Sequence, residues 1–229
     1  KPMLYDSGDY PKCQALALDK ISYDGFQIRK AKALEEGRYI GIGIANFVEG
    51  TGLGPFEGAT VRIQQNGRVE ILTSASSQGQ GHKTTFMQIC ADQLNIPLEM
   101  IDVITADTNV ISMGIGTFAS RITVNAGNSV FLASKNVAQK ITTLASFLLG
   151  CKVDEVQLID GFAITINDTS RKKSFSELAR VSQGMPGFSF PEGVTNGLES
   201  TEYFSPKQST YCNGTAAVEI ELDRGTCQI

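Results

Sequence analysis

The chain has 229 residues, of which 41% are hydrophobic, and a formal net charge of −4 with both signs scattered along it. This length allows one large domain or two small ones with a real core. No basic stripe appears, which argues against nucleic acid as a partner, and no apolar run approaches the ~18 residues that span a bilayer.

The N-terminal part of the chain predicts two helices and then a strand. Apolar residues recur at roughly helical spacing over 12–35, with an interruption at Tyr23-Asp24-Gly25, and Gly37 is a plausible stop. Residues 39–48 alternate glycine or another small residue with isoleucine, as a strand does when a neighbour packs tightly on one face. Residues 50–58 hold four glycines and a proline and predict a loop.

The middle of the chain predicts a hairpin, a helix and another strand. Two alternating runs, 59–64 and 68–73, flank Asn66-Gly67, and an Asn-Gly pair in that position is a strong hairpin signal. A helix is expected from about Thr84 to Asn95, followed by a strand over 101–104.

The C-terminal half predicts one long helix and several short elements. Residues 120–149 are mostly helical, with one apolar stripe at Val130, Ala133, Val137, Ile141 and Leu144 and a stop at Gly150. Beyond them the pattern predicts a hairpin within 156–166, a helix opened by a capping box at 174–177, a loop over 182–196 and a strand over 216–222.

This order of elements predicts an α+β fold, with mixed sheets, antiparallel hairpins and packed helices, rather than a doubly wound sheet. We expect an N-terminal helical segment, 1–36, and an α+β domain, 37–229, that is incomplete and divided into two subdomains. The chain begins at Lys1 and stops at Ile229 within what reads as a strand, so we expect a fragment of a larger polypeptide.

Two glycine-rich loops that each run into a helix are the candidate ligand site. The first is Gln78-Gly79-Gln80-Gly81-His82 and the second is Met113-Gly114-Ile115-Gly116-Thr117. Glycine lets the backbone approach a ligand closely, and the free N–H groups of a first helical turn attract anions. Neither loop is a Walker A or GxGxxG motif. Two such loops predict a large phosphate-bearing cofactor; taken alone, the first is equally compatible with an ordinary strand-to-helix turn.

The segments that carry a family resemblance follow one another along the chain: Gly37 to Gly43, Glu49 to Gly52 with Gly54-Pro55 and Glu57, Gln78 to His82 with Thr84 and Gln88, Ala106 to Thr108, and Thr117 to Arg121. In this ordered series the chain resembles the large, molybdopterin-binding subunit of the xanthine oxidase family of molybdenum hydroxylases. That family includes xanthine dehydrogenases, aldehyde oxidoreductases, aerobic carbon monoxide dehydrogenases and bacterial N-heterocycle hydroxylases.

The resemblance implies which residues bind the cofactor. Gly79, Gln80 and Gly81 would bind the pterin through backbone N–H groups and one side-chain amide. A second segment would cradle the pterin and its phosphate at a helix N-terminus, where N–H groups and hydroxyls stabilise an anion. Phe118 stands in this segment where the family usually has a small residue. Its members are Thr117, Phe118, Ala119, Ser120, Arg121, Ile122 and Thr123.

The resemblance also implies the reaction and the partners. Family members hydroxylate a carbon next to a ring nitrogen or carbonyl on a molybdenum–molybdopterin cofactor, which in bacteria usually carries a cytosine dinucleotide. Electrons leave through 2Fe-2S centres, often to FAD, on partner domains or subunits. We therefore expect a part of an oxidoreductase large subunit that acts on an N-heterocycle or aldehyde and associates with the rest of that subunit. A non-catalytic scaffold or assembly module of the same fold is the alternative, and a phosphate-ligand domain unrelated to molybdenum is a third.

The family's catalytic glutamate lies in a Gly-Glu motif near the end of the large subunit. No Gly-Glu pair follows residue 58 here, and the family's Phe-Arg-Gly motif is missing too. We therefore expect the general base outside this chain, no catalytic residue within it, and no turnover by the chain alone. The five cysteines show no CxxC or Cys/His spacing, which predicts no metal ligands and reduced thiols in a cytoplasmic protein.

Four single residues have two interpretations each, and a fifth has one. The resemblance places Glu49 near the substrate channel, where a carboxylate orients a basic or N–H-bearing ring. Glu49 also reads as a solvated loop charge. Glu57 serves either role equally well. His82, the only histidine, is a catalytic candidate or a helix-start packing residue. Arg121 pairs with a phosphate or has a structural role, and Cys90 reads most simply as a core residue.

Overall fold

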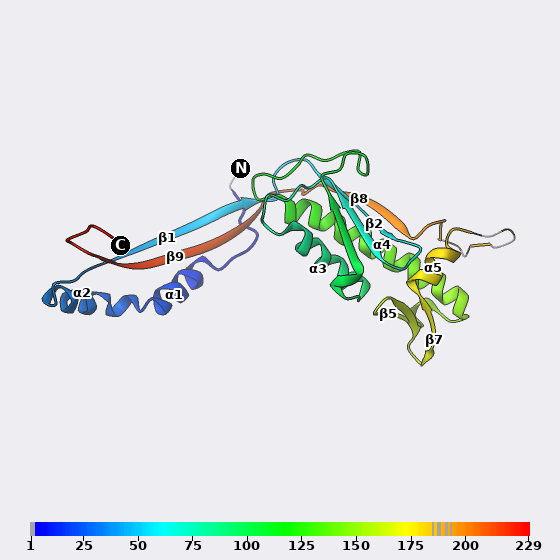
Figure 1. Cartoon of the computed structure of the whole chain (residues 1–229), viewed down its shortest axis with the longest axis horizontal. Coiled ribbons are helices and arrows are strands. Elements are labelled where there is room, and N and C mark those ends of the chain that lie inside the picture. Colours follow the sequence, from blue (N-terminus) through cyan, green and yellow to red (C-terminus); the bar gives the residue numbers. More distant parts are fainter. Residues whose placement is uncertain (1–2, 185, 187–188, 191, 193) are drawn as a thin grey trace. The chain divides into compact units, whose positions relative to one another are not determined.

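A computed structural model describes residues 3–184, 186, 189–190, 192 and 194–229, and their contacts divide the chain into two compact units (Figure 1). The first unit joins Lys1–Thr51 to Ser209–Ile229, and the second unit is Gly52–Gln208. This grouping differs from the expected boundary at residue 36, because the strand after that residue clusters with the N-terminal helices. As a statement about domains, the division into 1–36 and 37–229 stays a prediction.

The first unit is a long two-stranded ribbon with helices along one side (Figure 1). The predicted helical region is confirmed, and it breaks at Tyr23–Gly25, where a 3-10 turn, η1, separates two helices. Its elements are α1 (Tyr10–Lys20), α2 (Phe26–Glu35), β1 (Tyr39–Thr51) and β9 (Thr210–Leu222), with β1 and β9 antiparallel over their whole length.

Within the described residues, Gly41 and Gly43 of β1 have no tightly packed neighbour, so that part of the strand prediction stays a prediction. A Cβ placed on Gly43 meets nothing within 4 Å, and one placed on Gly41 meets only the Ile220 side chain, at 3.8 Å. The face that bears these glycines is therefore open in this unit.

The second unit is built on a four-stranded mixed sheet in the order β4-β3-β2-β8. The predicted hairpin is confirmed, since β2 and β3 are antiparallel, whereas β3 and β4 are parallel. Two helices pack together against this sheet (Figure 1). The elements are β2 (Glu57–Ile63), β3 (Val69–Thr73), α3 (His82–Leu94), η2 (Leu98–Met100), β4 (Ile101–Thr105), α4 (Ile122–Leu149) and β8 (Glu199–Phe204).

The core of the second unit lies between that sheet and α4. The predicted stripe on α4 is confirmed, because all five of its side chains are fully buried. Gly150 ends the helix in the left-handed conformation that glycine adopts readily. The predicted capping box is also present, with Ser174 and Glu177 bonding each other's backbone N–H groups.

A small second sheet completes this unit, in the order β5-β6-β7. Two strands went unpredicted, β7 and β8, because their sequences are largely polar. The expected loop over 182–196 lies partly outside the described residues. The remaining elements are η3 (Val153–Glu155), β5 (Val156–Ile159), β6 (Phe162–Thr165), β7 (Asp168–Ser174) and α5 (Phe175–Val181).

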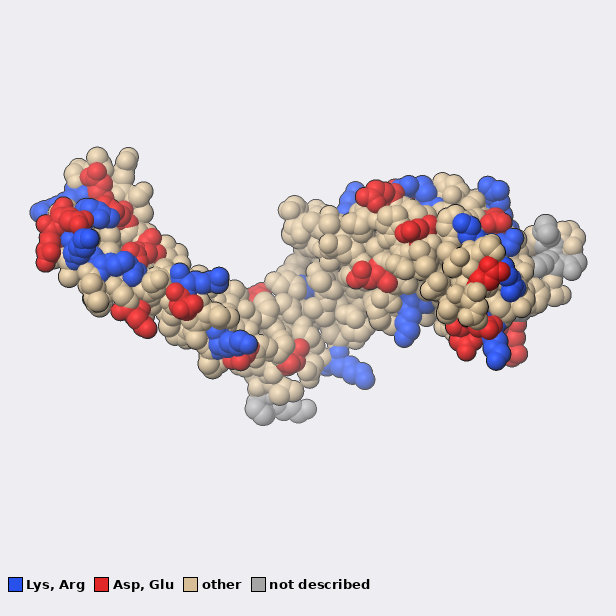
Figure 2. All heavy atoms as spheres, turned by 90° about the horizontal axis from the view of Figure 1, so that it is seen from below, with Lys and Arg blue, Asp and Glu red and all other residues tan. Residues whose placement is uncertain are grey.

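Helices and mixed sheets together confirm the α+β class. On the face that Figure 2 shows, acidic and basic side chains are interspersed, without a broad patch of one sign. Within the described residues, no helix combines the length and the apolar character that a membrane crossing needs.

Candidate functional site

The two candidate loops leave the same edge of the main sheet. Strands β3 and β4 are parallel neighbours, and their last residues, Thr73 and Thr105, are paired. We call residues 74–81, between β3 and α3, the first loop, and residues 106–121, between β4 and α4, the second loop. The edge beyond the carboxyl ends of parallel strands is where open α/β sheets bind ligands.

Direct hydrogen bonds join the two loops. The Thr117 hydroxyl donates to the Ser76 carbonyl at 2.5 Å, and the Gln78 side-chain amide donates to the Thr117 carbonyl at 3.3 Å. Within the first loop, Oε1 of Gln80 accepts from the Gln78 N–H at 2.5 Å. The oxygen of Gln80 is thereby engaged, so its amide nitrogen is the atom that can serve a ligand.

Both loops present helix starts that are open to an anion. Neither α3 nor α4 has a side-chain cap or an acidic residue in its first turn. Gly79 and Gly81 have φ values of +100° and +81°, and a Cβ on either would meet nothing within 4 Å. The N–H groups of a first turn have no intrahelical acceptor, and the helix dipole favours negative charge there. This donor set therefore suits a phosphate-bearing group.

The end of the second loop has a strained backbone. Ala119 and Ser120 both have positive φ, 48° and 50°, although neither is glycine. Such residues cost roughly 1–3 kcal/mol each and cluster at ligand sites and switches. Phe118 beside them is 50% exposed, Thr123 is exposed, and Ile122 is buried, so the side chain of Ile122 belongs to the core.

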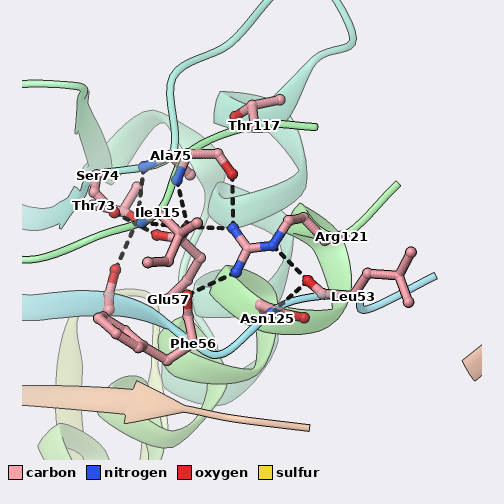
Figure 3. Close-up of polar contacts among 12 residues, drawn as sticks. Leu53, Phe56, Glu57, Thr73, Ser74, Ala75, Ile115, Thr117, Arg121 and Asn125 are labelled. Atoms are coloured by element: carbon pink, nitrogen blue, oxygen red, sulfur yellow. Dashed lines mark hydrogen bonds and ion pairs between the residues drawn. The ribbon is translucent and has the colours of Figure 1, made fainter. Parts of the chain in front are cut away.

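A wholly buried ion pair holds the second loop against β2 (Figure 3). Glu57 and Arg121 are each 0% exposed, and their closest oxygen and nitrogen atoms are 2.5 Å apart. The same Glu57 oxygen accepts from the N–H groups of Ile115 and Gly116 at 3.0 and 2.8 Å. Its other oxygen accepts from the Ser74 hydroxyl at 2.5 Å, so the carboxylate also reaches the first loop.

The Arg121 guanidinium is fully used by the protein itself. Nε donates to the Leu53 carbonyl at 2.6 Å, Nη1 to the Gly116 carbonyl at 2.7 Å, and Nη2 to the Phe56 carbonyl at 2.7 Å. With the Asn125 amide turned so that both of its polar atoms are satisfied, its oxygen accepts from Nη2 at 3.0 Å. Together with the Glu57 bond these contacts occupy all five donors, and the backbone N–H of Arg121 donates to the Phe118 carbonyl at 3.3 Å, so Arg121 has no donor left for a ligand.

These contacts decide between several interpretations of single residues. Glu57 is neither a solvated loop charge nor a substrate-facing carboxylate, because it is buried and bonded on both oxygens. For Arg121 the contacts support the structural interpretation. Glu49 is exposed on β1 of the first unit. Sequence reasoning missed Ser74, whose place directly after a buried strand was its only signal.

His82 lies at the first position of α3 and is 5% exposed. Its ring centroid is 5.8 Å from that of Phe86, as expected of a packing residue. Burial lowers the pKa of His82, against an opposing hydrogen bond with the backbone of Ser76, so the ring is neutral at pH 7. Nδ1 has no hydrogen-bond partner among the described residues, and it adds an unused polar atom at the helix start.

The donors at this edge suit a hydrogen-bonded anion better than a bare metal ion. Within the described parts of the chain, no group of three or more His, Cys, Asp or Glu is placed to hold a metal. Cys90 is fully buried on α3, and burial raises its pKa to about 11, so it is a core thiol without nucleophilic character at neutral pH.

A family model and several known proteins are similar to this chain. A family model described as a molybdopterin cofactor-binding domain matches residues 16–229. The chain is 31% identical to the carbon monoxide dehydrogenase large chain of Hydrogenophaga pseudoflava, over 97% of this chain and 29% of that protein. It is 32% identical to the nicotine 6-hydroxylase large subunit of Paenarthrobacter nicotinovorans, over 96% of this chain and 28% of that protein.

Solved structures show the same fold. Quinoline 2-oxidoreductase from Pseudomonas putida 86 matches with a TM-score of 0.83 and 29% identity, over 96% of this chain and 29% of that chain. The chain thus spans less than a third of the length of the curated relatives described above.

Proposed function

Because this chain belongs to the molybdopterin cofactor-binding domain family, we propose that its first and second loops together hold the pterin and phosphate of a molybdenum cofactor. The observation that carries this proposal is the pair of uncapped, acid-free helix starts, joined by hydrogen bonds at one sheet edge. The proposed whole is a large subunit that hydroxylates an N-heterocycle or an aldehyde.

Each loop contributes in a different way. Gly79 and Gly81 offer backbone N–H groups with no Cβ in the approach path, and Gln80 offers its amide nitrogen. Residues 117–123 offer the N-terminus of α4 and the Thr123 hydroxyl, while Arg121 positions this segment through its contact with Glu57. When bound, the molybdenum supplies the redox chemistry of hydroxylation. The residues of this chain bind and orient the cofactor.

The buried Glu57–Arg121 pair gives the second loop its shape. Glu57 takes up the N–H groups of Ile115 and Gly116, so these two amides are not part of the proposed cofactor cradle. The cradle therefore begins after Gly116, at the residues whose backbone leads into α4. A charged pair in this position holds the loop open before any ligand arrives, which lowers the cost of ordering it on binding.

The complete activity requires parts beyond this chain. We propose that the general-base glutamate lies in another part of the large subunit, and that 2Fe-2S and FAD partners carry electrons away from a cytosine dinucleotide form of the cofactor in a cytoplasmic enzyme. Glu49 as a substrate-orienting residue belongs to the same proposal. The relatives described above are named large chain and large subunit, which supports a multi-subunit assembly.

Cofactor content tests the proposal. In the complete protein, Gly81→Ala places a methyl group in the proposed cradle, and we expect at least a tenfold loss of molybdenum and oxidisable pterin per polypeptide. Gly150→Ala is the matched control, since Gly150 also has positive φ, +61°, and open space around its Cβ position, but ends α4 away from the loops. Both changes carry a similar backbone penalty of about 1–2 kcal/mol, because each places a Cβ on a residue in the left-handed conformation.

Two outcomes contradict the proposal. Full cofactor content in the Gly81→Ala protein removes the first loop from the site. A wild-type protein that is purified with its subunits and holds neither molybdenum nor pterin favours the scaffold alternative instead.

A further inference from the structure

The ribbon of β1 and β9 has one face partly covered by helices and one face bare. Side chains alternate between the faces of a strand. On the helix side, Ile40 and Ile42 are half-buried, whereas Val48 is 43% exposed. Glu219 pairs with Arg29 of α2 at 2.5 Å, and Glu221 pairs at 2.7 Å with Arg38, which lies between α2 and β1.

On the opposite side of the ribbon, the stretch from Tyr39 to Phe47 with its partners on β9 is uncharged, and we call this stretch the outer face. Beyond it, the same side of the ribbon bears Glu49, Thr51 and Thr210. The strand register pairs the residues of the outer face directly across from one another. The phenol of Tyr39, at one end, is its only polar side-chain group, and Arg224 stacks on that ring. The outer face consists of Tyr39, Gly41, Gly43, Ala45 and Phe47 of β1 and Gly214, Ala216, Val218, Ile220 and Leu222 of β9.

Large apolar side chains on this face are open to solvent. Val218 is 57% exposed, Phe47 54% and Leu222 40%. Between them lie Gly41 and Gly43, whose lack of side chains makes the centre of the face low and smooth. A contiguous apolar surface of this kind, rimmed by charged residues, marks a site of contact with another protein segment.

The first unit lacks a core of its own. Among its described residues only Phe26 and Ala33 are buried hydrophobics, and both belong to α2 rather than to the ribbon. A two-stranded ribbon is marginally stable by itself in water. The outer face therefore needs a cover for the ribbon to persist as seen.

The size of the outer face indicates what covers it. Nine positions at ~3.3 Å per residue on two strands ~4.8 Å apart give an area of roughly 300 Å². A stable complex between separate proteins buries about 800 Å² on each partner. A face of this size holds a segment on the same polypeptide far better than a free partner, because tethering raises the effective concentration to about the millimolar range.

We propose that the outer face is covered by an uncharged, apolar helix or sheet from a part of the large subunit outside these 229 residues. This inference rests on the proposed function only because it treats the chain as part of a longer subunit. The chain covers 29% of the Hydrogenophaga relative, which supports that treatment. Gly41, Gly43 and Ala45 let the backbone of that segment approach the ribbon closely.

Thiol labelling in the complete large subunit tests the proposal. Val218→Cys introduces a thiol in the middle of the outer face, and Ile28→Cys is the matched control, because Ile28 is 77% exposed on α2. Peptide mapping separates these thiols from the native cysteines. We expect the position 218 thiol to react at least a hundredfold more slowly than the position 28 thiol, in the large subunit expressed without its other subunits.

Three results would overturn the proposal. Rates at both positions that equal the rate of a free thiol mean that the face is bare. Protection at position 218 that disappears on dilution points to a second copy of the chain, and protection that requires another subunit points to a separate partner. Cofactor content is measured independently of labelling, so failure of this inference and failure of the cofactor proposal are distinguishable.

Discussion

Removing the buried carboxylate of Glu57 tests how the second loop is held. In the Glu57→Gln protein the side chain keeps its shape, but the fully buried Arg121 guanidinium loses its counter-charge. Breaking a buried pair in this way costs about 3–5 kcal/mol. At about 1.36 kcal/mol for each tenfold change, this equals a loss of roughly a hundredfold to a few thousandfold in an opening equilibrium.

Hydrogen exchange measures this loss of free energy at the second loop. Ile115 and Gly116 donate their N–H groups to Glu57, so the exchange protection of the peptide that contains them reports opening of the loop. We expect their exchange protection to fall by roughly a hundredfold to a few thousandfold in Glu57→Gln. We expect the double variant Glu57→Gln, Arg121→Gln to lose less free energy than the sum of the two single variants, because the two residues form one network.

An exposed pair supplies the control. Arg68 and Asp102 are paired at 2.6 Å, but their side chains are 40% and 49% exposed. Asp102→Asn should therefore cost less than about 1 kcal/mol and leave the second loop unchanged. If Glu57→Gln leaves the exchange of Ile115 and Gly116 within a factor of about five of wild type, the buried pair does not hold the loop and our reasoning is wrong.

Three further predictions concern packing, pH and thiol reactivity. Gly114→Ala should lower the thermal midpoint, because its Cβ would overlap the side chain of Ser74, at a cost of about 1–3 kcal/mol; an unchanged midpoint refutes the packing. Burial lowers the pKa of His82 below 6.5, so on acidification the unfolded chain binds the proton before the folded chain does. The free energy of unfolding therefore falls as pH drops below about 6.5 towards the folded pKa. Urea unfolding should show this dependence on pH in the wild type and not in His82→Gln. Native alkylation at pH 8 should label exposed Cys212 well before buried Cys90, whose pKa is raised to about 11, and equal labelling would contradict that burial.

Local signals in the sequence predicted much of the fold. The Asn66-Gly67 turn specified the hairpin, and the apolar stripe on α4 identified the buried side of the longest helix. Strands β7 and β8 escaped prediction because a partly exposed strand need not carry an apolar alternation. The parallel neighbours β3 and β4 also went unnoticed, since pairing across an intervening helix leaves no local pattern.

The loops of the candidate site could be predicted from the sequence, but the buried Glu57–Arg121 pair that holds the second loop could not. Glycine spacing marked the first loop, and the helix that follows each loop was visible as a pattern. Glu57 read as a loop charge because it lies in a glycine-rich stretch, between Gly54-Pro55 and Gly58. Its burial depends on Arg121, which lies 64 residues further along the chain, and no local feature connects the two.

The connectivity of the ribbon has a consequence for how the chain folds. Thr51 and Thr210 are paired across the ribbon, with their hydroxyl oxygens 2.6 Å apart, although the whole second unit intervenes between them in sequence. Closing so long a disordered loop costs about 4–5 kcal/mol in chain entropy. A folded second unit brings its two ends close together and removes most of that cost. Zipping of β1 onto β9 should therefore wait for the second unit to form, and damage inside that unit should loosen strands that it does not contain.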